Sequence, residues 1–256
     1  MMITNNEKNL YIGISTCLFI ISRFILSLIT PWLTGSKRSY ALSLIVATFH
    51  SIISGVGSWM CIWLYYNGSE PAQNEMSIYF LIFSTSYFIY DILNTILTLP
   101  MNYANLSSIV HHIAVSIFFF CAIPVNCIYM SRYEAMSVNI AVIILGAELT
   151  MPTMNLQWII DTYFVNRNDK IKKFSDILAG INIIVYFMFR ILYSNFLVFW
   201  IIIPSGILTN VFLIGITMTL YLLNHIWFYK IVMKYRLRAL SALRILRTLR
   251  TSTTFN

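Results

Sequence analysis

Residues 76–99 read MSIYFLIFSTSYFIYDILNTILTL, and they are the clearest guide to the architecture. A membrane-spanning helix needs about 20 predominantly apolar residues, and this run supplies them with Asp91 as its only charged side chain. Its polar positions recur every three or four residues and so share one helix face. They are Ser84, Tyr87, Asp91, Asn94 and Thr98. The run therefore predicts a membrane-spanning helix with one polar face.

The composition of the whole 256-residue chain agrees with this prediction. Hydrophobic residues make up 59% of the chain, against about 45–50% in a soluble domain, and charged residues make up 10% against about 25%. The mean hydropathy is +0.75. So few charged side chains cannot cover the surface of a water-soluble protein of this size. Cytosolic enzymes, nucleic-acid binders and disordered scaffolds are thereby excluded, and we predict an all-α integral membrane protein.

Seven segments are apolar enough and long enough to span a bilayer as helices. They run roughly over Leu10–Ile29, Tyr40–Tyr66, Met76–Leu99, Leu106–Ile123, Tyr133–Thr150, Ile177–Ile203 and Ile207–Val232. The first lacks a small-x-small cleavage site before Pro31, so we expect it to be retained and not removed as a signal peptide. The fifth contains Glu134 and Glu148. The short apolar stretch Thr153–Val165 that follows it is compatible with a re-entrant or interfacial segment.

The basic residues are distributed unequally between the two sides that seven spans define. Lys8 and Arg132 fall on the amino-terminal side. The other side receives Lys37, Arg38, Arg167, Lys170, Lys172, Lys173 and the tail residues from Lys230 to Arg250. Because basic residues accumulate on the cytoplasmic or matrix side, the amino terminus is expected outside or in a lumen and the tail inside. The tail is interpreted as a basic helix that touches anionic lipid headgroups or, alternatively, docks a partner subunit.

Ionisable side chains inside spans are costly and by default mark a functional site. The predicted spans contain His50, Asp91, His111, His112, Glu148, Arg190 and His225. Several other spans also carry a polar stripe, and such stripes must face one another or water. We therefore predict a bundle around a polar cavity, lined as a funnel that opens inward. In that funnel Glu148 is expected in the inner half and Arg190 nearer the middle.

Each of these residues also has a structural interpretation. Arg190 and Asp91 could form a buried ion pair that locks the bundle. His50 and His225 could be hydrogen-bonding packing residues. Adjacent helical residues point about 100° apart, so only one of His111 and His112 is expected to face the cavity. No spacing typical of a metal site occurs, and the four cysteines Cys17, Cys61, Cys121 and Cys127 are interpreted as small apolar residues.

Three motifs together resemble the TLC-domain family, which includes ceramide synthases and small TLC-domain transmembrane proteins. They are SYFIYD at 86–91, VHHIAV at 110–115 and GAELTMPTMNLQW at 146–158. The resemblance covers roughly Arg38 to Tyr235 and is strongest to the small branch. It implies a six-helix barrel preceded by an extra helix. The chain then divides into an amino-terminal segment with the first span (1–37), a TLC-like domain (38–235) and a basic tail (236–256).

In ceramide synthases, the paired histidines serve acyl transfer from acyl-CoA. The resemblance therefore implies His111, His112 and Asp91 as catalytic residues if this chain is an acyltransferase. Two features depart from that pattern. Val115 stands where those enzymes have threonine, and residues 146–150 (GAELT) replace an HDxxD-type signature.

Three functions are considered first, and a transporter or channel, which broken helices or inverted repeats would support, is a fourth possibility. The leading one is a protein of lipid homeostasis, in the endoplasmic reticulum as the resemblance implies, that holds a membrane lipid in its cavity without a cofactor. The cavity residues would be His50, Tyr87, Asp91, His112, Glu148, Asn155, Arg190, Asn224 and His225. The second is an acyl-CoA-dependent N-acyltransferase. The third is an accessory subunit of a large membrane complex, with the mitochondrial inner membrane as an alternative compartment. No nucleic-acid partner is expected.

Overall fold

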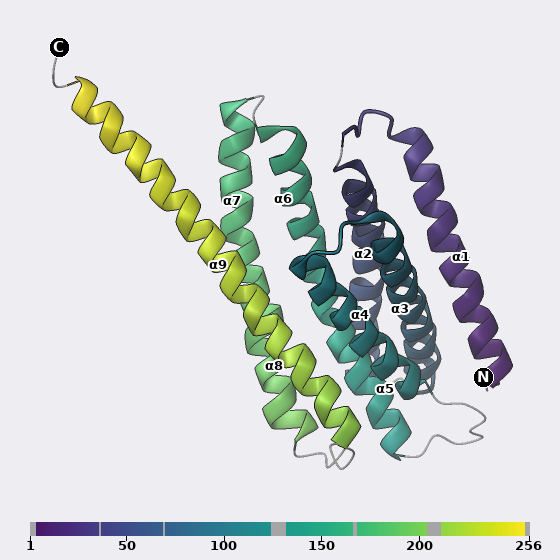
Figure 1. The fold of residues 1–256 in the computed structure, drawn as a ribbon. Coiled ribbons are helices and arrows are strands. Elements are labelled where there is room, and N and C mark those ends of the chain that lie inside the picture. The colour runs from purple at the N-terminus through teal and green to yellow at the C-terminus, as the bar shows by residue number, and fades with distance from the viewer. Residues whose placement is uncertain are drawn as a thin grey trace.

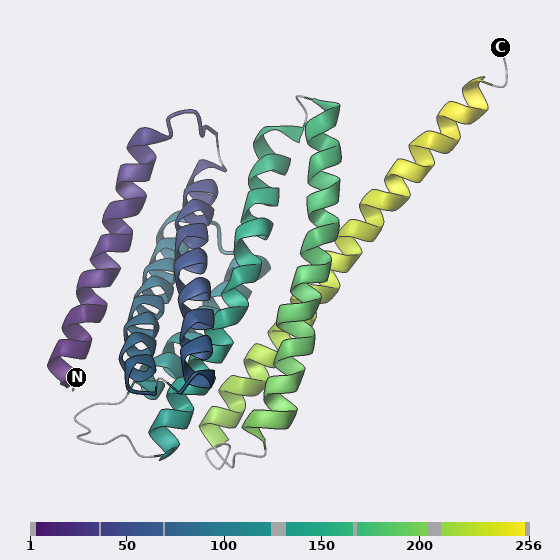
Figure 2. The same cartoon turned by 180° about the vertical axis from the view of Figure 1, so that it is seen from behind.

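The computed structural model describes residues 4–35, 37–68, 70–123, 132–165, 168–203 and 211–253, and in these ranges it is helical without strands (Figure 1). The helices are α1 (Asn5–Ile29), α2 (Arg38–Tyr66), α3 (Glu70–Thr98), α4 (Tyr103–Ala122), α5 (Arg132–Leu145), α6 (Met151–Tyr163), α7 (Asp169–Tyr186), α8 (Tyr193–Phe196) and α9 (Val211–Thr253). The long segments run alternately up and down, so the two termini lie at opposite ends of the bundle (Figures 1 and 2). The all-helical prediction is confirmed.

Polar side chains and glycines set several helix boundaries. Thr4 and Glu7 form a reciprocal capping box at the start of α1, and Asn102 and Asn168 cap α4 and α7 through their side chains. Gly35, in the α1–α2 turn, has a φ of 79°, which favours glycine over residues with a Cβ atom. Such caps satisfy backbone groups that the helix itself leaves without partners.

Six helical segments in the described part of the chain are long and apolar enough to cross a membrane. They are Asn5–Ile29, Arg38–Tyr66, Glu75–Thr98, Tyr103–Ala122, Ser137–Tyr163 and Asp169–Phe199. The seventh long helix is α9, which crosses the bundle obliquely and extends beyond it at the carboxyl end (Figures 1 and 2). These seven segments correspond to the seven expected from the sequence.

The fifth segment corrects a boundary predicted from the sequence. The 3₁₀-helical turn Gly146–Thr150 joins α5 to α6 without a break, so residues 153–163 complete a span and are neither re-entrant nor interfacial. Pro152 lies at the start of α6, directly after the 3₁₀-helical turn, where a proline is tolerated better than in the interior of an α-helix. Glu148 consequently lies inside this span and not near its end.

Six of the long segments form a closed ring, with α1 outside it. Around the ring, α2 contacts α3, α3 contacts α4, α4 contacts α9, α9 contacts α7, α7 contacts α6, and α6 contacts α2. The helix α5 packs against α2, α3 and α4. The first helix packs on α2 and α3 and is tied to the ring by Thr16, whose hydroxyl donates to the Ser86 carbonyl at 3.3 Å. The predicted six-helix barrel with an extra amino-terminal helix is therefore present.

The polar stripes face the interior of the bundle. Ser54, Ser84 and Asn94 are buried, and the Asn94 amide donates to the Ser43 hydroxyl across the α2–α3 interface at 2.7 Å. Large apolar residues occupy the outer surface instead, as with Phe24, which is 64% exposed. Apolar residues outside and polar residues inside are the arrangement expected of a protein surrounded by lipid hydrocarbon.

Candidate functional site

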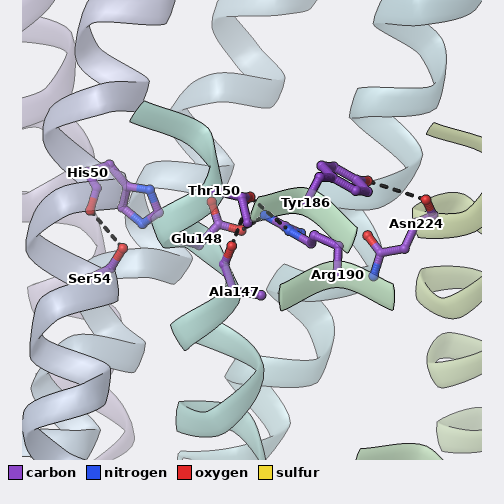
Figure 3. A network of polar contacts seen from close by, with 8 residues as sticks. All are labelled: His50, Ser54, Ala147, Glu148, Thr150, Tyr186, Arg190 and Asn224. Atoms are coloured by element: carbon purple, nitrogen blue, oxygen red, sulfur yellow. Dashed lines mark hydrogen bonds and ion pairs between the residues drawn. The ribbon is translucent and has the colours of Figure 1, made fainter. Parts of the chain in front are cut away.

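A buried ion pair joins two irregular helical segments in the middle of the bundle (Figure 3). Arg190 Nη2 lies 2.8 Å from Glu148 Oε1, and Arg190 Nε donates to Thr150 Oγ1 at 3.2 Å. The Arg190 and Glu148 residues are 5% and 8% exposed. Two charges removed from water in this way need both pairing and further hydrogen bonds, and the threonine hydroxyl supplies one of these.

The backbone around this pair departs from the α-helix on both sides. Glu148 and Thr150 belong to the 3₁₀-helical turn Gly146–Thr150, and Arg190 belongs to the π-helical segment Phe187–Leu192 that follows α7. A second π-helical segment, Leu197–Ile202, follows α8. Such segments inside long helices are frequent at functional sites because they redirect side chains.

The partners of the buried charges differ from the pair considered in the sequence analysis. Arg190 contacts Glu148, whereas Asp91 Oδ2 lies 3.0 Å from Nδ1 of His112. The possible Arg190–Asp91 ion pair is therefore wrong. The continuous fifth span places Glu148 at the level of Arg190, so the arginine finds its carboxylate on the 3₁₀-helical turn and not on α3.

The two adjacent histidines point to different surroundings, as their angular separation requires. His111 lines the central pocket described below, and its ring centroid lies 5.0 Å from that of Trp227 in an edge-to-face contact. His112 instead contacts Asp91 and the ring of Phe88. Of the two histidines, His111 therefore lines the central pocket, whereas the predicted cavity residue His112 does not.

A central pocket of about 60 Å³ lies beside the Glu148–Arg190 pair, bounded by α4, α5, α9 and the two π-helical segments. His111, Glu148, Arg190 and Asn224 form its polar end. Its other walls are mainly apolar and include Val115, Phe118, Phe119, Leu145, Leu197, Val198 and Leu220. The pocket therefore combines one charged end with a long apolar wall.

A second cavity, of about 230 Å³, lies nearer the end of the bundle that carries the carboxyl terminus. Asn155, Asn182 and Lys234 line it, and the Asn182 amide donates to Gln157 Oε1 at 2.6 Å. Successive turns of the same helices line the two cavities. Along α7, Tyr186 lies between Asn182 and Arg190, and its hydroxyl contacts the Asn224 carbonyl at 3.4 Å (Figure 3). The two cavities share no lining residue.

The remaining predicted cavity residues lie apart from the central pocket. The His50 residue is 0% exposed and stacks on Tyr87, with ring centroids 3.9 Å apart. His225 Nδ1 lies 2.9 Å from the Tyr221 carbonyl of its own helix. The Asn155 amide donates to the Thr48 hydroxyl at 3.1 Å and lies in the second cavity. Tyr87, Asp91, His112 and His225 line neither cavity.

The sequence analysis missed several polar residues of the site. Thr150 contacts Arg190, while Ser194 and Thr217 line the central pocket. Ser194 follows Arg190 by four residues and donates to its carbonyl at 2.5 Å, a spacing that a search for polar partners of Arg190 could have found. In the described ranges no group of three or more His, Cys, Asp or Glu side chains could hold a metal ion.

Comparison with models of protein families gives a match to the TLC domain (TRAM, LAG1, CLN8) over residues 39–233, which is more than half of the chain. No curated protein and no solved structure matches the chain. The matched residues include all of the central pocket and all of the second cavity except for Lys234 and Tyr235.

Proposed function

The chain belongs to the TLC-domain family of multi-pass membrane proteins, and on that premise we propose that its central pocket binds a membrane lipid. The observation that carries the proposal is the pocket itself, in which a buried ion pair meets a mainly apolar wall. A lipid has the same two parts, a polar head and an apolar chain. In this role the protein would contribute to membrane lipid homeostasis.

Each part of the pocket has a task in this proposal. Arg190 and Asn224 supply hydrogen-bond donors for the oxygen atoms of a lipid head, because a guanidinium and an amide both carry N–H groups. The aromatic and aliphatic wall, which includes Phe118, Phe119 and Leu197, accommodates the start of a chain through apolar burial. No metal or cofactor is needed for binding of this kind.

The size of the pocket sets a condition on binding. About 60 Å³ is well below the roughly 300–1,000 Å³ of pockets that enclose a drug-sized ligand, so a whole acyl chain needs more space than the pocket offers. We propose that α9 or the segment Leu197–Ile202 moves outward to admit a lipid. The π-helical hydrogen bonding of that segment makes it the natural place for such a movement.

The direct test is native mass spectrometry of the full chain in mild detergent, with a variant that fills the pocket. Thr217→Phe places a ring into the pocket, whereas Thr219→Phe makes the same change at a half-buried position of α9 that does not line the pocket. We expect the wild type and Thr219→Phe to retain lipid and Thr217→Phe to lose it. Equal lipid on all three proteins would overturn the proposal.

Acyl transfer is the second candidate, and one observation favours it. Asp91 Oδ2 lies 3.0 Å from His112 Nδ1, and a carboxylate beside a histidine is one component of general base catalysis, although these two atoms do not form a hydrogen bond in the structure. His111 would then present its imidazole to the pocket. Incubation of the purified protein with long-chain acyl-CoA and long-chain amines tests this candidate. The absence of both an amide product and an acylated histidine would remove it.

The membrane orientation and compartment are also proposed. Lys37, Arg38, Lys170, Lys172 and Lys173 lie at the end of the bundle that carries the carboxyl terminus, and this supports a cytosolic position for that end. The endoplasmic reticulum is the compartment that the family resemblance favours. The basic carboxyl-terminal tail would then contact anionic lipids of the cytosolic leaflet or another membrane subunit.

A further inference from the structure

A further cavity lies outside the ring, in a groove between α1, α2 and α3. It measures about 420 Å³ and is separate from the central pocket, with which it shares no lining residue. Ser15, Leu18 and Ile25 line it from α1, and Phe49, His50 and Ile53 line it from α2. Nothing in the proposed function of the central pocket uses this groove.

The groove opens toward the surroundings of the bundle and not toward its interior. Leu18, Phe49 and Ile53 are 56%, 57% and 49% exposed, and all three lie in segments that are long and apolar enough to cross a membrane. An opening lined in this way faces the hydrocarbon of the bilayer, because these residues would be unfavourable in water. Lipid chains therefore have direct access to the groove.

Polar atoms without partners gather beside this apolar opening, around the ring of Phe19. Arg23 Nε and Tyr90 Oη are buried and have no hydrogen-bond partner among the described residues. The ring of Tyr90 lies 5.9 Å from that of Phe19. Neither Arg23 nor Tyr90 lines the groove itself, but Arg23 follows the lining residue Phe19 by one helical turn, and its neighbours Ser22 and Leu26 also line the groove.

An arginine in this position calls for an anionic partner. The Arg23 guanidinium lies in a candidate span and forms no ion pair with the described residues. A buried charge or hydrogen-bonding group without a partner is costly, and ionisable groups in spans by default have a functional role. The donors of Arg23 and Tyr90 are suited to the same kind of ligand, one with several acceptor oxygens.

The groove runs along most of the depth of the bilayer that α1 crosses. Arg23 lies six residues before the end of α1, about 9 Å along the helix, and Ser15 lies about 21 Å from that end. The hydrocarbon core is about 30 Å thick, so with the end of α1 at one interface the groove reaches past the middle of the membrane. An acyl chain whose head lies at that interface can therefore extend along the groove.

We propose that a phospholipid of the leaflet at the α1–α2 turn binds in this groove, with an acyl chain over Leu18 and Phe49 and with phosphate oxygens accepting hydrogen bonds from Arg23 and Tyr90. A phosphate group supplies hydrogen-bond acceptors and a negative charge, which are the partners that the Arg23 guanidinium does not find among the described residues. His50, at the deep end, forms part of the wall against the chain. The bound lipid fills the space between α1 and the ring.

Photolabelling of the full chain in phosphatidylcholine vesicles tests the proposal. The vesicles contain a trace of phosphatidylcholine with a diazirine in one acyl chain, and labelled peptides are mapped after irradiation. We expect labelling around Leu18 and Phe49 to exceed labelling around the exposed residues Ile181 and Ile184 of α7. Arg23→Gln should lower the groove signal about tenfold, as for the loss of one charge-assisted hydrogen bond, and leave the α7 signal unchanged.

Further variants and a second lipid probe distinguish the contributions of the groove, the lipid phosphate and the central pocket to the labelling. Ser15→Trp fills the groove and should abolish its labelling, whereas Gly13→Trp, at a position with open space beside it, should not. A diazirine-tailed diacylglycerol, which lacks the phosphate, should label the groove weakly and independently of Arg23. Thr217→Phe should leave the groove signal intact, so this proposal and that for the central pocket can fail separately.

The proposal is overturned by any one of three results. They are groove labelling no stronger than that of α7, an unchanged groove signal in Arg23→Gln, and diacylglycerol labelling that is as strong and as dependent on Arg23 as that of phosphatidylcholine. Arg23→Lys, which keeps the charge, should retain most of the signal. A loss of the signal in Arg23→Lys equal to that in Arg23→Gln would also count against an electrostatic role.

Discussion

At the scale of single residues, Arg190 shows how the bundle handles a charge in its interior. The guanidinium contacts Glu148 at 2.8 Å and Thr150 at 3.2 Å, so the charge is compensated and partly hydrogen-bonded. Removing one member of such a pair leaves the other charged and buried, which costs more than removing both. This asymmetry separates a structural contribution of the pair from a role in binding.

Arg190→Ala should destabilise the protein by about 3–5 kcal/mol, because it leaves Glu148 buried without its partner. The double variant Glu148→Leu with Arg190→Leu should recover most of that stability. Thermal unfolding in detergent, followed by circular dichroism, measures both effects. Lys170→Ala, at an exposed position, is the control and should change little. A double variant no more stable than Arg190→Ala would contradict the prediction.

The same variants also report on function. If the pair binds a lipid head, then the double variant should be stable yet retain less lipid than the wild type in native mass spectrometry. If the pair only locks the bundle, then the double variant should retain as much lipid as the wild type. Stability and lipid content are thus two separate readouts on one protein.

At the scale of helices, close approaches hold the irregular segments in place. Gly55 of α2 packs against the 3₁₀-helical turn, and a Cβ atom at this position would lie 2.6 Å from Leu149 Cγ and 3.1 Å from the Leu149 backbone nitrogen. Leu149 follows Glu148 directly. The helix α2 therefore sets the position of the turn that carries the carboxylate.

Gly55→Ala should destabilise the protein by about 1–3 kcal/mol through overpacking, although alanine is favoured over glycine in a helix by about 1 kcal/mol. The matched control is Gly13→Ala on α1, where a Cβ atom meets nothing within 4 Å and the helix preference alone should act. Thermal unfolding of the two variants is the measurement. A Gly55→Ala protein as stable as Gly13→Ala would mean that the turn moves freely.

Lys8 provides a second contact between elements, at the amino end of α1. Its ammonium donates to the Phe120 carbonyl at 2.8 Å and lies 3.6 Å from the centroid of the Phe120 ring, at the carboxyl end of α4. The residue is 3% exposed. A cation at a helix carboxyl end is favourable because the last carbonyl groups lack helical partners.

Lys8→Met should cost about 1.5–3 kcal/mol, the range for a hydrogen bond to a charged group, and should loosen the amino end of α1. Hydrogen exchange measured by mass spectrometry should show faster exchange in the first turns of α1 and little change in α7. Lys8→Arg, which keeps a cation, should restore much of the protection. Unaltered exchange in Lys8→Met would show that the contact contributes nothing.

At the scale of the whole molecule, the ring of six segments and the outer helix α1 create two kinds of space. One lies inside the ring beside the buried ion pair, and the other lies between the ring and α1. The alternating direction of the segments places the α1–α2 turn, the α6–α7 connection and the carboxyl end of α9 at one end of the bundle (Figures 1 and 2). These parts should therefore share one side of the membrane.

Thiol labelling in sealed vesicles tests this topology. On a background without native cysteines, Lys37→Cys and Lys170→Cys should react with a membrane-impermeant maleimide on the same side. Tyr66→Cys, an exposed position at the opposite end of α2, should react on the other side. Labelling of Tyr66→Cys from the same side as Lys170→Cys would exclude the alternating arrangement.

The sequence by itself determined the architecture of this protein. Apolar runs such as 76–99 need about 20 residues to span a bilayer, and the spacing of Ser84, Asp91 and Asn94 assigns them to one face. Both properties depend only on the local sequence, and the structure confirms both: the runs are helices, and the polar faces point inward. The motifs around His111 and Glu148 likewise indicated the TLC domain, which the family model matches.

Only the tertiary structure decided how the polar residues pair and where the cavities lie. The 3₁₀-helical turn at Glu148 and the π-helical segment at Arg190 change the rotation of the side chains that follow, which a uniform period of 3.6 residues does not anticipate. The axial register between helices, fixed by contacts such as that of Gly55 with Leu149, then brought Arg190 to Glu148 and His112 to Asp91. Pairing across helices depends on that register, and the register is a property of packing that no single segment contains.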